Sequence, residues 1–202
     1  EGFSLYNRDQ DTFSNYFYKE NGYKATVTCI APMNKDYLML GTTSGVLLFD
    51  IGKERILNDT LPHPLHLLRP TAMVRQSDKI YIGVEKGLYV YSLANGTLEK
   101  LVDMPKATRI HSVFCQMFTR IWIATEGEGL YMYDTKSKEL KNYRHEDGYS
   151  GLNSNYVRSL AVDQENRLWV GTYGGLNIYE GGKDRFLSVR NSAIQEGSLS
   201  QN

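Results

Sequence analysis

The 202-residue sequence predicts an all-β fold built from repeated units of four strands, and three observations predict it. Tyrosine and glycine are plentiful, with 15 and 18 copies, a composition that favours strands joined by many turns. Short apolar runs end at Gly, Asn, Asp or Ser, and this punctuation is typical of strands rather than helices. Pairs of such runs also recur at a regular spacing, which indicates a repeat architecture.

The repeated element is an apolar run, a short turn and a second apolar run. Its last copy, RLWVGTYGGLNIY, occupies residues 167–179, and earlier copies lie at 38–49, 80–91 and 121–133. Each first run ends in a small residue, and these recur at spacings of 42, 41 and 47 residues: Gly41, Gly83, Ala124 and Gly171. Residues 2–6 match the second half of the element and form a partial copy. Periods of about 40 to 50 residues are typical of solenoids and propellers.

One full unit divides into four strands, which we call A to D. In the last copy we expect strand A at 156–162, strand B at 167–172, strand C at 175–180 and strand D at 185–190, with a polar turn at 163–166. Strand A begins at an apolar anchor 14 residues before the small residue, and the anchors are Val27, Ile110 and Val157. Strand B is apolar on both faces, as a sheet between two neighbouring sheets requires. Four-stranded blades around a channel satisfy this requirement, so the predicted fold is a β-propeller.

The repeats also predict the domain organisation. We expect one propeller segment over 1–202, with repeats at 1–20 (partial), 24–66, 67–107, 108–153 and 154–202. The partial copy lacks strands A and B, and no strand A follows the last repeat. About four and a half blades cannot close a ring by exchanging these pieces, so we expect an arc of a larger, seven-bladed propeller. Such an arc exposes apolar faces at both ends and should associate or be marginally stable.

The last unit carries a set of residues at fixed positions: Val157, Leu160, Asp163, Asn166, 168–172 and 174–176. This set resembles the two-component regulator propeller repeat. The resemblance weakens toward the first copies, where Met39 and Tyr81 replace the tryptophan. It implies the periplasmic sensor region of a hybrid two-component system histidine kinase from polysaccharide-degrading gut bacteria. It also implies an inner-membrane receptor that detects oligosaccharides and signals to its histidine kinase.

Charge and composition exclude several function classes. Lys plus Arg and Asp plus Glu both number 23, so no large field favours nucleic acid or an anionic membrane. No apolar run is long enough to span a bilayer, and no signal-peptide pattern begins the chain. Two cysteines, Cys29 and Cys115, are too few for a disulfide framework. We expect two free, largely buried thiols that face opposite sides of their sheets.

The glycine-rich turns are not expected to bind phosphate or a dinucleotide. They connect two strands rather than a strand and a helix, and turns that need positive φ explain them. The residues concerned are Gly127, Gly129, Gly174 and Gly175. Asp163 is likewise expected to form a turn by bonding nearby backbone N–H groups.

No metal or other cofactor is expected. His63 and His66 have an H-x-x-H spacing, but Pro62 and Pro64 predict an extended loop, and no third ligand lies close in the sequence. Four acidic residues in the loops could supply the paired carboxylates that glycoside cleavage needs, although the default interpretation is that their side chains are solvated surface charges. They are Glu126, Glu128, Glu146 and Asp147.

Ligand binding is expected where irregular residues gather on one face. In a propeller the B–C turns and the D–A connections share a face, and the D–A connections are expected at 56–68, 97–108, 140–154 and 187–202. The third connection and the B–C turns beside it offer aromatic rings and planar hydrogen-bonding groups, which sugar recognition needs. The candidate ligand-binding residues are Tyr143, Arg144, His145, Tyr149, Asn155, Glu126 and Tyr173.

The leading functional hypothesis is a non-catalytic sensor segment that recognises an oligosaccharide or another small ligand. It would relay the signal to the remaining blades and downstream domains of a homodimeric receptor. The first alternative is a structural or dimerisation platform without a ligand of its own. The second is a propeller lyase or glycosidase, for which no repeat supplies a specialised set of acid and base groups. No catalytic residue is therefore assigned.

Overall fold

The structure is a computed structural model, and it describes residues 2–17, 19–20, 23–57, 61, 63–145 and 151–189. In these residues the chain forms antiparallel sheets and one short helix, so the all-β fold class is confirmed. Two compact units are present, unit 1 (Glu1–Leu101) and unit 2 (Val102–Asn202). Each unit has its own hydrophobic core.

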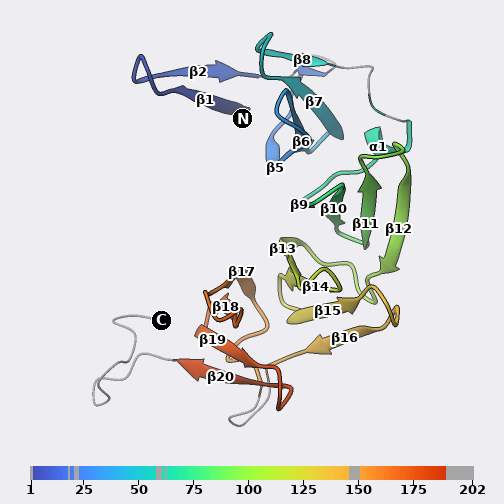
Figure 1. Cartoon of the computed structure of the whole chain (residues 1–202), viewed down its shortest axis with the longest axis vertical. Helices are drawn as coiled ribbons and strands as arrows, with labels where there is room; N and C mark the ends of the chain where they lie inside the picture. The colour runs from blue at the N-terminus through green and yellow to red at the C-terminus, as the bar shows by residue number, and fades with distance from the viewer. Residues whose placement is uncertain are drawn as a thin grey trace. The chain divides into compact units, whose positions relative to one another are not determined.

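Unit 1 contains two hairpins and two four-stranded antiparallel sheets (Figure 1). The hairpins are β1 (Phe3–Asn7) with β2 (Thr12–Tyr16), and β3 (Lys19–Glu20) with β4 (Tyr23–Lys24). Blade 1 consists of β5 (Val27–Pro32), β6 (Tyr37–Thr42), β7 (Val46–Asp50) and β8 (Arg55–Leu57). After helix α1 (His63–His66), blade 2 consists of β9 (Ala72–Gln76), β10 (Lys79–Val84), β11 (Gly87–Ser92) and β12 (Leu98–Asp103), and the division between the units falls within β12.

Blade 1 is buried on both of its faces. Every residue of β7 is buried, because successive side chains of a strand point to opposite faces and each face has a neighbour. On one face Leu48 packs in a common core with Ile80 of blade 2. On the other face the rings of Phe3 and Tyr16, from the first hairpin, lie 4.8 and 4.9 Å from the ring of Phe49. This two-sided burial is what the apolar strands of a propeller blade provide.

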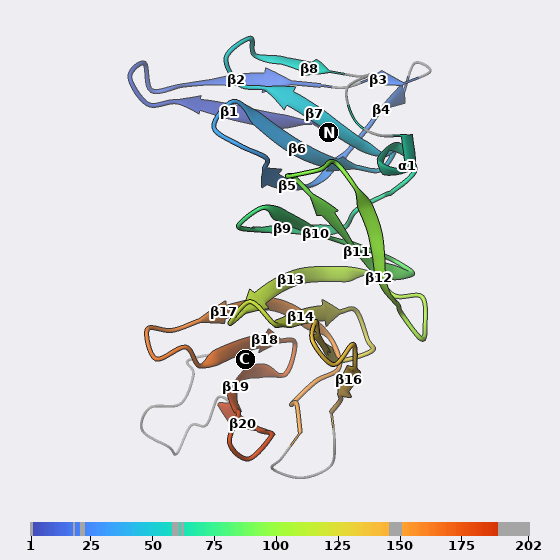
Figure 2. The ribbon, with the colours of Figure 1, turned by 45° about the vertical axis from the view of Figure 1, so that its right-hand side comes forward.

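Unit 2 contains two further blades that pack face to face. Blade 3 consists of β13 (Ile110–Gln116), β14 (Arg120–Thr125), β15 (Leu130–Asp134) and β16 (Leu140–Tyr143). Blade 4 consists of β17 (Val157–Val162), β18 (Leu168–Thr172), β19 (Gly175–Glu180) and β20 (Arg185–Val189), within one residue of the predicted strands. The first strands, β13 and β17, lie side by side (Figure 2). The shared core is centred on Trp122, which is fully buried and lies 5.0 Å from the Tyr179 ring.

Strand A of three blades contains a β-bulge directly after its apolar anchor. The register shifts between Val27 and Cys29 in β5, and the same shift occurs after Ile110 in β13 and after Val157 in β17. The extra residues are Thr28, His111 and Arg158. A bulge reverses the alternation of the strand, which explains why the next apolar position of each strand lies three residues after the anchor, at Ile30, Val113 and Leu160. It also gives His111 and Arg158 equivalent places in adjacent blades.

Asp163 forms the A–B turn of blade 4, as predicted. Its Oδ1 accepts hydrogen bonds from the backbone N–H groups of Glu165 and Arg167 at 3.0 and 2.9 Å. Its Oδ2 also accepts from the Trp169 indole N–H at 2.8 Å. The hydrogen bond from Trp169 first, and then those from Arg167, lower the pKa of the Asp163 carboxyl against the opposing effect of burial.

The glycine and cysteine predictions are confirmed in most details. Gly127, Gly129 and Gly175 have φ values of 90°, 80° and 112°. Gly174 is required for space instead, because a Cβ there would lie 2.4 Å from the Asn153 carbonyl oxygen. Both cysteines are free but only half-buried, and burial raises the pKa of the Cys29 thiol to about 11 and that of Cys115 to about 12. Both are therefore neutral thiols near pH 7.

Two local predictions are wrong. Residues 63–66 form helix α1 rather than an extended loop, because Pro64 lies in the first turn, where its missing N–H has no intrahelical acceptor. Leu65 then anchors this turn, fully buried against the cores of blades 1 and 2. The D–A connections are also shorter than predicted, since β12 and β16 occupy 98–103 and 140–143. An outer strand of a blade tolerates charged residues, so its sequence is easily mistaken for a loop.

Tyr143 is the site residue most affected by this correction. It ends β16 rather than lying in a loop, and its side chain is only 9% exposed. Its hydroxyl donates to Asp184 Oδ1 at 2.6 Å, and the Tyr179 hydroxyl donates to the same oxygen at 2.7 Å. Lys141 binds the other carboxylate oxygen of Asp184. Asp184 thus joins blade 4 to the last strand of blade 3, and Tyr143 contributes to the core.

Replacement of Asp184 by asparagine is expected to make the stability of the protein less dependent on pH in acid. Burial raises the pKa of this carboxyl, but the hydrogen bonds from Lys141, Tyr143 and Tyr179 outweigh it and lower the pKa to about 2. An unfolded-state pKa of about 3.9 means that this stabilisation is complete above pH ~5 and is lost progressively as the pH falls toward 2. Urea denaturation at pH 5 and pH 3 measures the effect. The difference in free energy of unfolding between wild type and Asp184→Asn should be smaller at pH 3 than at pH 5. An equal difference at both pH values would contradict the role assigned to Asp184.

Candidate functional site

One end of blades 3 and 4 gathers the loops that carry the candidate site. The backbone N–H groups of Gly127 and Gly129, in the B–C turn of blade 3, donate to the Asn155 carbonyl at 3.1 and 2.9 Å. Tyr173, in the B–C turn of blade 4, donates from its backbone to the Tyr156 carbonyl at 3.1 Å. The Thr108 hydroxyl donates to the Glu126 carbonyl at 2.9 Å. These bonds join two B–C turns and two D–A connections into one surface, as predicted.

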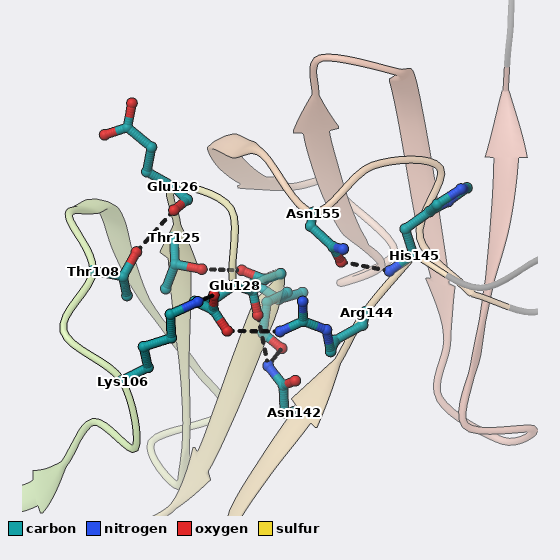
Figure 3. Close-up of polar contacts among 11 residues, drawn as sticks. Lys106, Thr108, Thr125, Glu126, Glu128, Asn142, Arg144, His145 and Asn155 are labelled. Carbon is teal, nitrogen blue, oxygen red and sulfur yellow. Dashed lines mark hydrogen bonds and ion pairs between the residues drawn. The ribbon is translucent and has the colours of Figure 1, made fainter.

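Glu128 is the most enclosed charged residue of this surface. Its side chain is 14% exposed, and it accepts from Lys106 Nζ at 2.5 Å and from Arg144 Nη1 at 2.7 Å (Figure 3). Hydrogen bonds from Lys106 and Arg144 lower the pKa of this carboxyl. A catalytic acid for glycoside cleavage needs a raised pKa, so Glu128 is unsuited to that role. Its carboxylate fixes the positions of two cations instead.

An aromatic pair lies beside the B–C turn of blade 3, where Glu126 pairs with Tyr156. The rings of Tyr156 and Tyr173 are stacked, with centroids 5.5 Å apart and planes inclined by 11°. The two residues remain 47% and 61% exposed. The guanidinium of Arg158 lies 5.3 Å from the centre of the Tyr173 ring, within the range of a cation–π contact. Aromatic surface and a planar donor group therefore occur together.

His111 holds Arg158 in place. Arg158 Nη1 lies 2.9 Å from His111 Nε2, and because a guanidinium only donates hydrogen bonds, the ring nitrogen accepts and His111 is neutral. Burial first, and then the charge of Arg158, lower the pKa of His111 against the opposing effect of Glu126. The Glu126 carboxylate lies 3.6 Å from the same ring nitrogen. In Figure 3 the Glu126 side chain points away from the cluster formed by Glu128, Lys106 and Arg144, here called the Glu128 cluster.

The structure brings together some of the predicted residues and not others. Arg144 and Glu126 lie at the surface, and Tyr173 belongs to the aromatic pair. Asn155 and His145 organise the connection itself: Asn155 Oδ1 accepts from the His145 backbone N–H at 2.6 Å (Figure 3), and His145 Nδ1 donates to the Leu152 carbonyl at 2.7 Å. Tyr143 is buried in the core, as described above. Three predicted positions lie outside the described residues: Glu146, Asp147 and Tyr149.

Four further residues belong to this surface, although the sequence pattern does not predict them as site residues: Tyr156, Arg158, His111 and Lys106. For two of them a signal exists, because His111 and Arg158 each directly follow an apolar anchor and are therefore bulge residues. Nothing in the sequence pattern marks Tyr156 or Lys106.

A groove of about 380 Å³ lies between β16 and the β19–β20 turn. It is lined by Lys141, Tyr143, Arg144, Lys183, Asp184 and Arg185, among others. Arg144 is the residue that this groove shares with the Glu128 cluster. Within the described ranges, no three His, Cys, Asp or Glu side chains are placed to hold a metal ion.

The fold and these blades define the class of protein: the chain is a β-propeller segment of four-stranded blades. Residues 151–174 match the family model described as two component regulator propeller. This stretch runs from the D–A connection through the B–C turn of blade 4, and includes Asn155, Tyr156, Arg158 and Tyr173. The chain thus carries the two-component regulator propeller repeat, and the predicted resemblance is confirmed.

Comparison with known proteins agrees with this assignment. Histidine kinase P4 of Formosa agariphila is 39% identical over 59 residues, which cover 29% of this chain and 4% of that kinase. The extracellular domain of a hybrid two-component system from B. thetaiotaomicron matches 100% of this chain and 26% of its own length, with 23% identity and a TM-score of 0.72. The chain therefore spans about a quarter of that domain.

The fold also occurs in an enzyme. Virginiamycin B lyase from Staphylococcus aureus matches 93% of this chain and 63% of its own length, with 12% identity and a TM-score of 0.65. Fold likeness at these identities establishes architecture, and function has to be argued from the site. No helix of the described part of the chain is long and apolar enough to cross a membrane.

Proposed function

We propose that the chain is the ligand-recognition propeller of a periplasmic two-component receptor and that it binds oligosaccharides without cleaving them. The observation that carries this proposal is the exposed Tyr156–Tyr173 pair between polar and cationic groups. Sugars present apolar ring faces and hydroxyl groups, and proteins bind them with aromatic surface beside planar hydrogen-bonding groups. Asn155, Arg158 and Glu126 supply such groups at this surface.

Signalling would pass through the rest of the receptor. The proposal includes further propeller blades, an inner-membrane segment and a histidine kinase in a homodimer. The much greater length of the matched relatives supports the further blades, and the name of one relative supports the histidine kinase. A ligand that bridges the blade 3 and blade 4 turns would change the packing between two blades. Because packed interfaces are bistable rather than continuously deformable, such a change can be transmitted through neighbouring blades.

Replacement of Tyr173 by alanine is expected to weaken oligosaccharide binding by about two- to tenfold, since an aromatic contact is worth about 0.5–1.5 kcal/mol. The measurement is calorimetric titration of the protein with a panel of neutral and acidic oligosaccharides, with product analysis of each mixture. Phe118→Ala is the control, because Phe118 is also exposed, at 74%, but lies on the β13–β14 turn. Equal affinity of wild type and Tyr173→Ala would contradict the site. Product release would favour the lyase or glycosidase alternative.

A structural platform is the second candidate function, and one observation favours it. The β13–β14 turn exposes Met117 and Phe118, at 63% and 74%, and both have positive φ values, 49° and 59°. Non-glycine residues in this conformation are strained, and strain of this kind often marks a functional contact. The platform would be supported if the protein binds no oligosaccharide but forms a dimer in light scattering, and if Phe118→Ala abolishes that dimer.

A further inference from the structure

The cations of the candidate surface are unequally matched by carboxylates. Lys106 and Arg144 both bind Glu128, so two of the positive charges share one negative charge. Arg158 binds the neutral ring of His111 and has no carboxylate within ion-pair distance among the described residues. Arg158 therefore forms no ion pair with the described side chains, and the Glu126 carboxylate lies nearby, 3.6 Å from the same His111 nitrogen.

Arg158 is also held in an orientation that leaves most of its donors available. A guanidinium has five N–H groups, and His111 accepts from only one of its nitrogens. The contact with the Tyr173 ring restrains the guanidinium plane, so less rotamer freedom is lost when a ligand binds. A planar, preoriented guanidinium is the group that best binds a carboxylate or sulfate through two parallel hydrogen bonds.

The position of this guanidinium relates it to the aromatic pair. Because Arg158 lies against Tyr173, a sugar ring in contact with the tyrosines brings its substituents within reach of the guanidinium. A neutral sugar would leave the charge of Arg158, an exposed residue, without an ion-pair partner. An acidic sugar would neutralise it.

We infer that the oligosaccharide recognised at this surface is anionic, and that Arg158 determines this specificity by binding a carboxylate or sulfate group. The inference rests on the proposed function, because it specifies the chemistry of the ligand at the same site. His111 is a positioning residue in this arrangement: it accepts from Arg158 and directs the remaining N–H groups away from itself.

The test uses matched pairs of oligosaccharides that differ only in charge. Oligogalacturonate and its methyl ester report on carboxylate recognition, and a sulfated galactan oligosaccharide with its desulfated form reports on sulfate recognition. Calorimetric titration of wild type should show at least tenfold tighter binding of the charged member of one pair. That preference should weaken as NaCl rises from 0.05 to 0.5 M, because salt screens the attraction between solvent-exposed charges.

Variants separate charge recognition from sugar contact. Arg158→Gln should remove the preference for the charged member, because affinity for the charged member should fall about tenfold more than affinity for the neutral member, and Arg158→Lys should restore part of this preference. Tyr173→Ala should weaken both members. Arg75→Gln is the matched control, because Arg75 is an exposed arginine of blade 2 whose Nε donates to the Ser77 carbonyl. Thermal melting of each variant confirms that folding is intact.

Each outcome decides between the two proposals. Tight binding of a neutral oligosaccharide that depends on Tyr173 but not on Arg158 would overturn the anionic inference and leave the proposed function standing. Absence of binding by every charged and neutral oligosaccharide would overturn both. A charge preference that persists in Arg158→Gln would move anion recognition to other cations and overturn the role of Arg158.

Discussion

Replacement of Trp122 by alanine is expected to lower the free energy of unfolding by about 3–5 kcal/mol, the range observed for large aromatic deletions in cores. The indole is fully buried between blades 3 and 4 and lies 5.7 Å from the Tyr143 ring and 5.0 Å from the Tyr179 ring. Its N–H donates to Gln116 Oε1 at 2.9 Å. Alanine would therefore leave a cavity and would also remove the donor that satisfies a buried amide oxygen. Urea denaturation followed by circular dichroism measures the loss.

Trp169 provides an internal control for this prediction. It occupies the same position in blade 4, where its N–H donates to Asp163 Oδ2 at 2.8 Å. Its ring is only partly buried, so Trp169→Ala should cost about 1–2 kcal/mol, within the usual range for a single substitution. Equal losses for the two variants would mean that burial between the blades does not govern their stability. A loss below about 1 kcal/mol for Trp122→Ala would contradict the packing described for unit 2.

The same pair of tryptophans shows how far the sequence predicts the fold. The strands are predictable because buried sheets need apolar runs and tight turns need particular residues. The pattern of one blade therefore predicts the strands of the other blades. The partner of Trp122 was not recognised, although Gln116 precedes it by the same six residues that separate Asp163 from Trp169. The Gln116 amide and the Asp163 carboxylate both accept a hydrogen bond from the tryptophan of their blade. Because the two residues differ in type, their equivalence is not visible in the sequence. Gln116 also donates to the Asn166 carbonyl at 2.8 Å and so connects the two blades.

The candidate site was predictable at the level of loops and much less at the level of side chains. Loop position placed Glu126, Asn155 and Tyr173 on one surface, because turns at the same strand ends lie together. Strict alternation along strand A does not anticipate the bulges at His111 and Arg158, which depend on the pairing of β13 with β14 and of β17 with β18. Contacts between blades, such as the bond between these two residues, are tertiary and leave no local pattern.

Replacement of Gly129 by alanine is expected to lower the free energy of unfolding by about 2–4 kcal/mol, because it combines backbone strain with a steric clash. Gly129 has a φ of 80°, which costs an L-residue about 1–2 kcal/mol. A Cβ at this position would also lie 2.3 Å from the carbonyl oxygen of Tyr143. That carbonyl cannot easily move away, because Leu130 pairs with Tyr143 in the sheet. Gly182→Ala is the control, since no atom of the described residues beyond its chain neighbours lies within 4 Å of its added Cβ, and it should change stability by less than about 0.5 kcal/mol.

The same substitution should affect ligand binding more than its effect on stability alone would suggest. The Gly129 N–H donates to the Asn155 carbonyl at 2.9 Å, and its own carbonyl accepts from the Thr125 hydroxyl at 2.6 Å. Movement of this turn would displace Glu128 and, with it, the two cations that Glu128 holds. Under the proposed function, oligosaccharide affinity should fall at a temperature where Gly129→Ala remains folded, while Gly182→Ala should bind as wild type does. Unchanged affinity in a destabilised Gly129→Ala protein would show that the ligand does not depend on the B–C turn of blade 3.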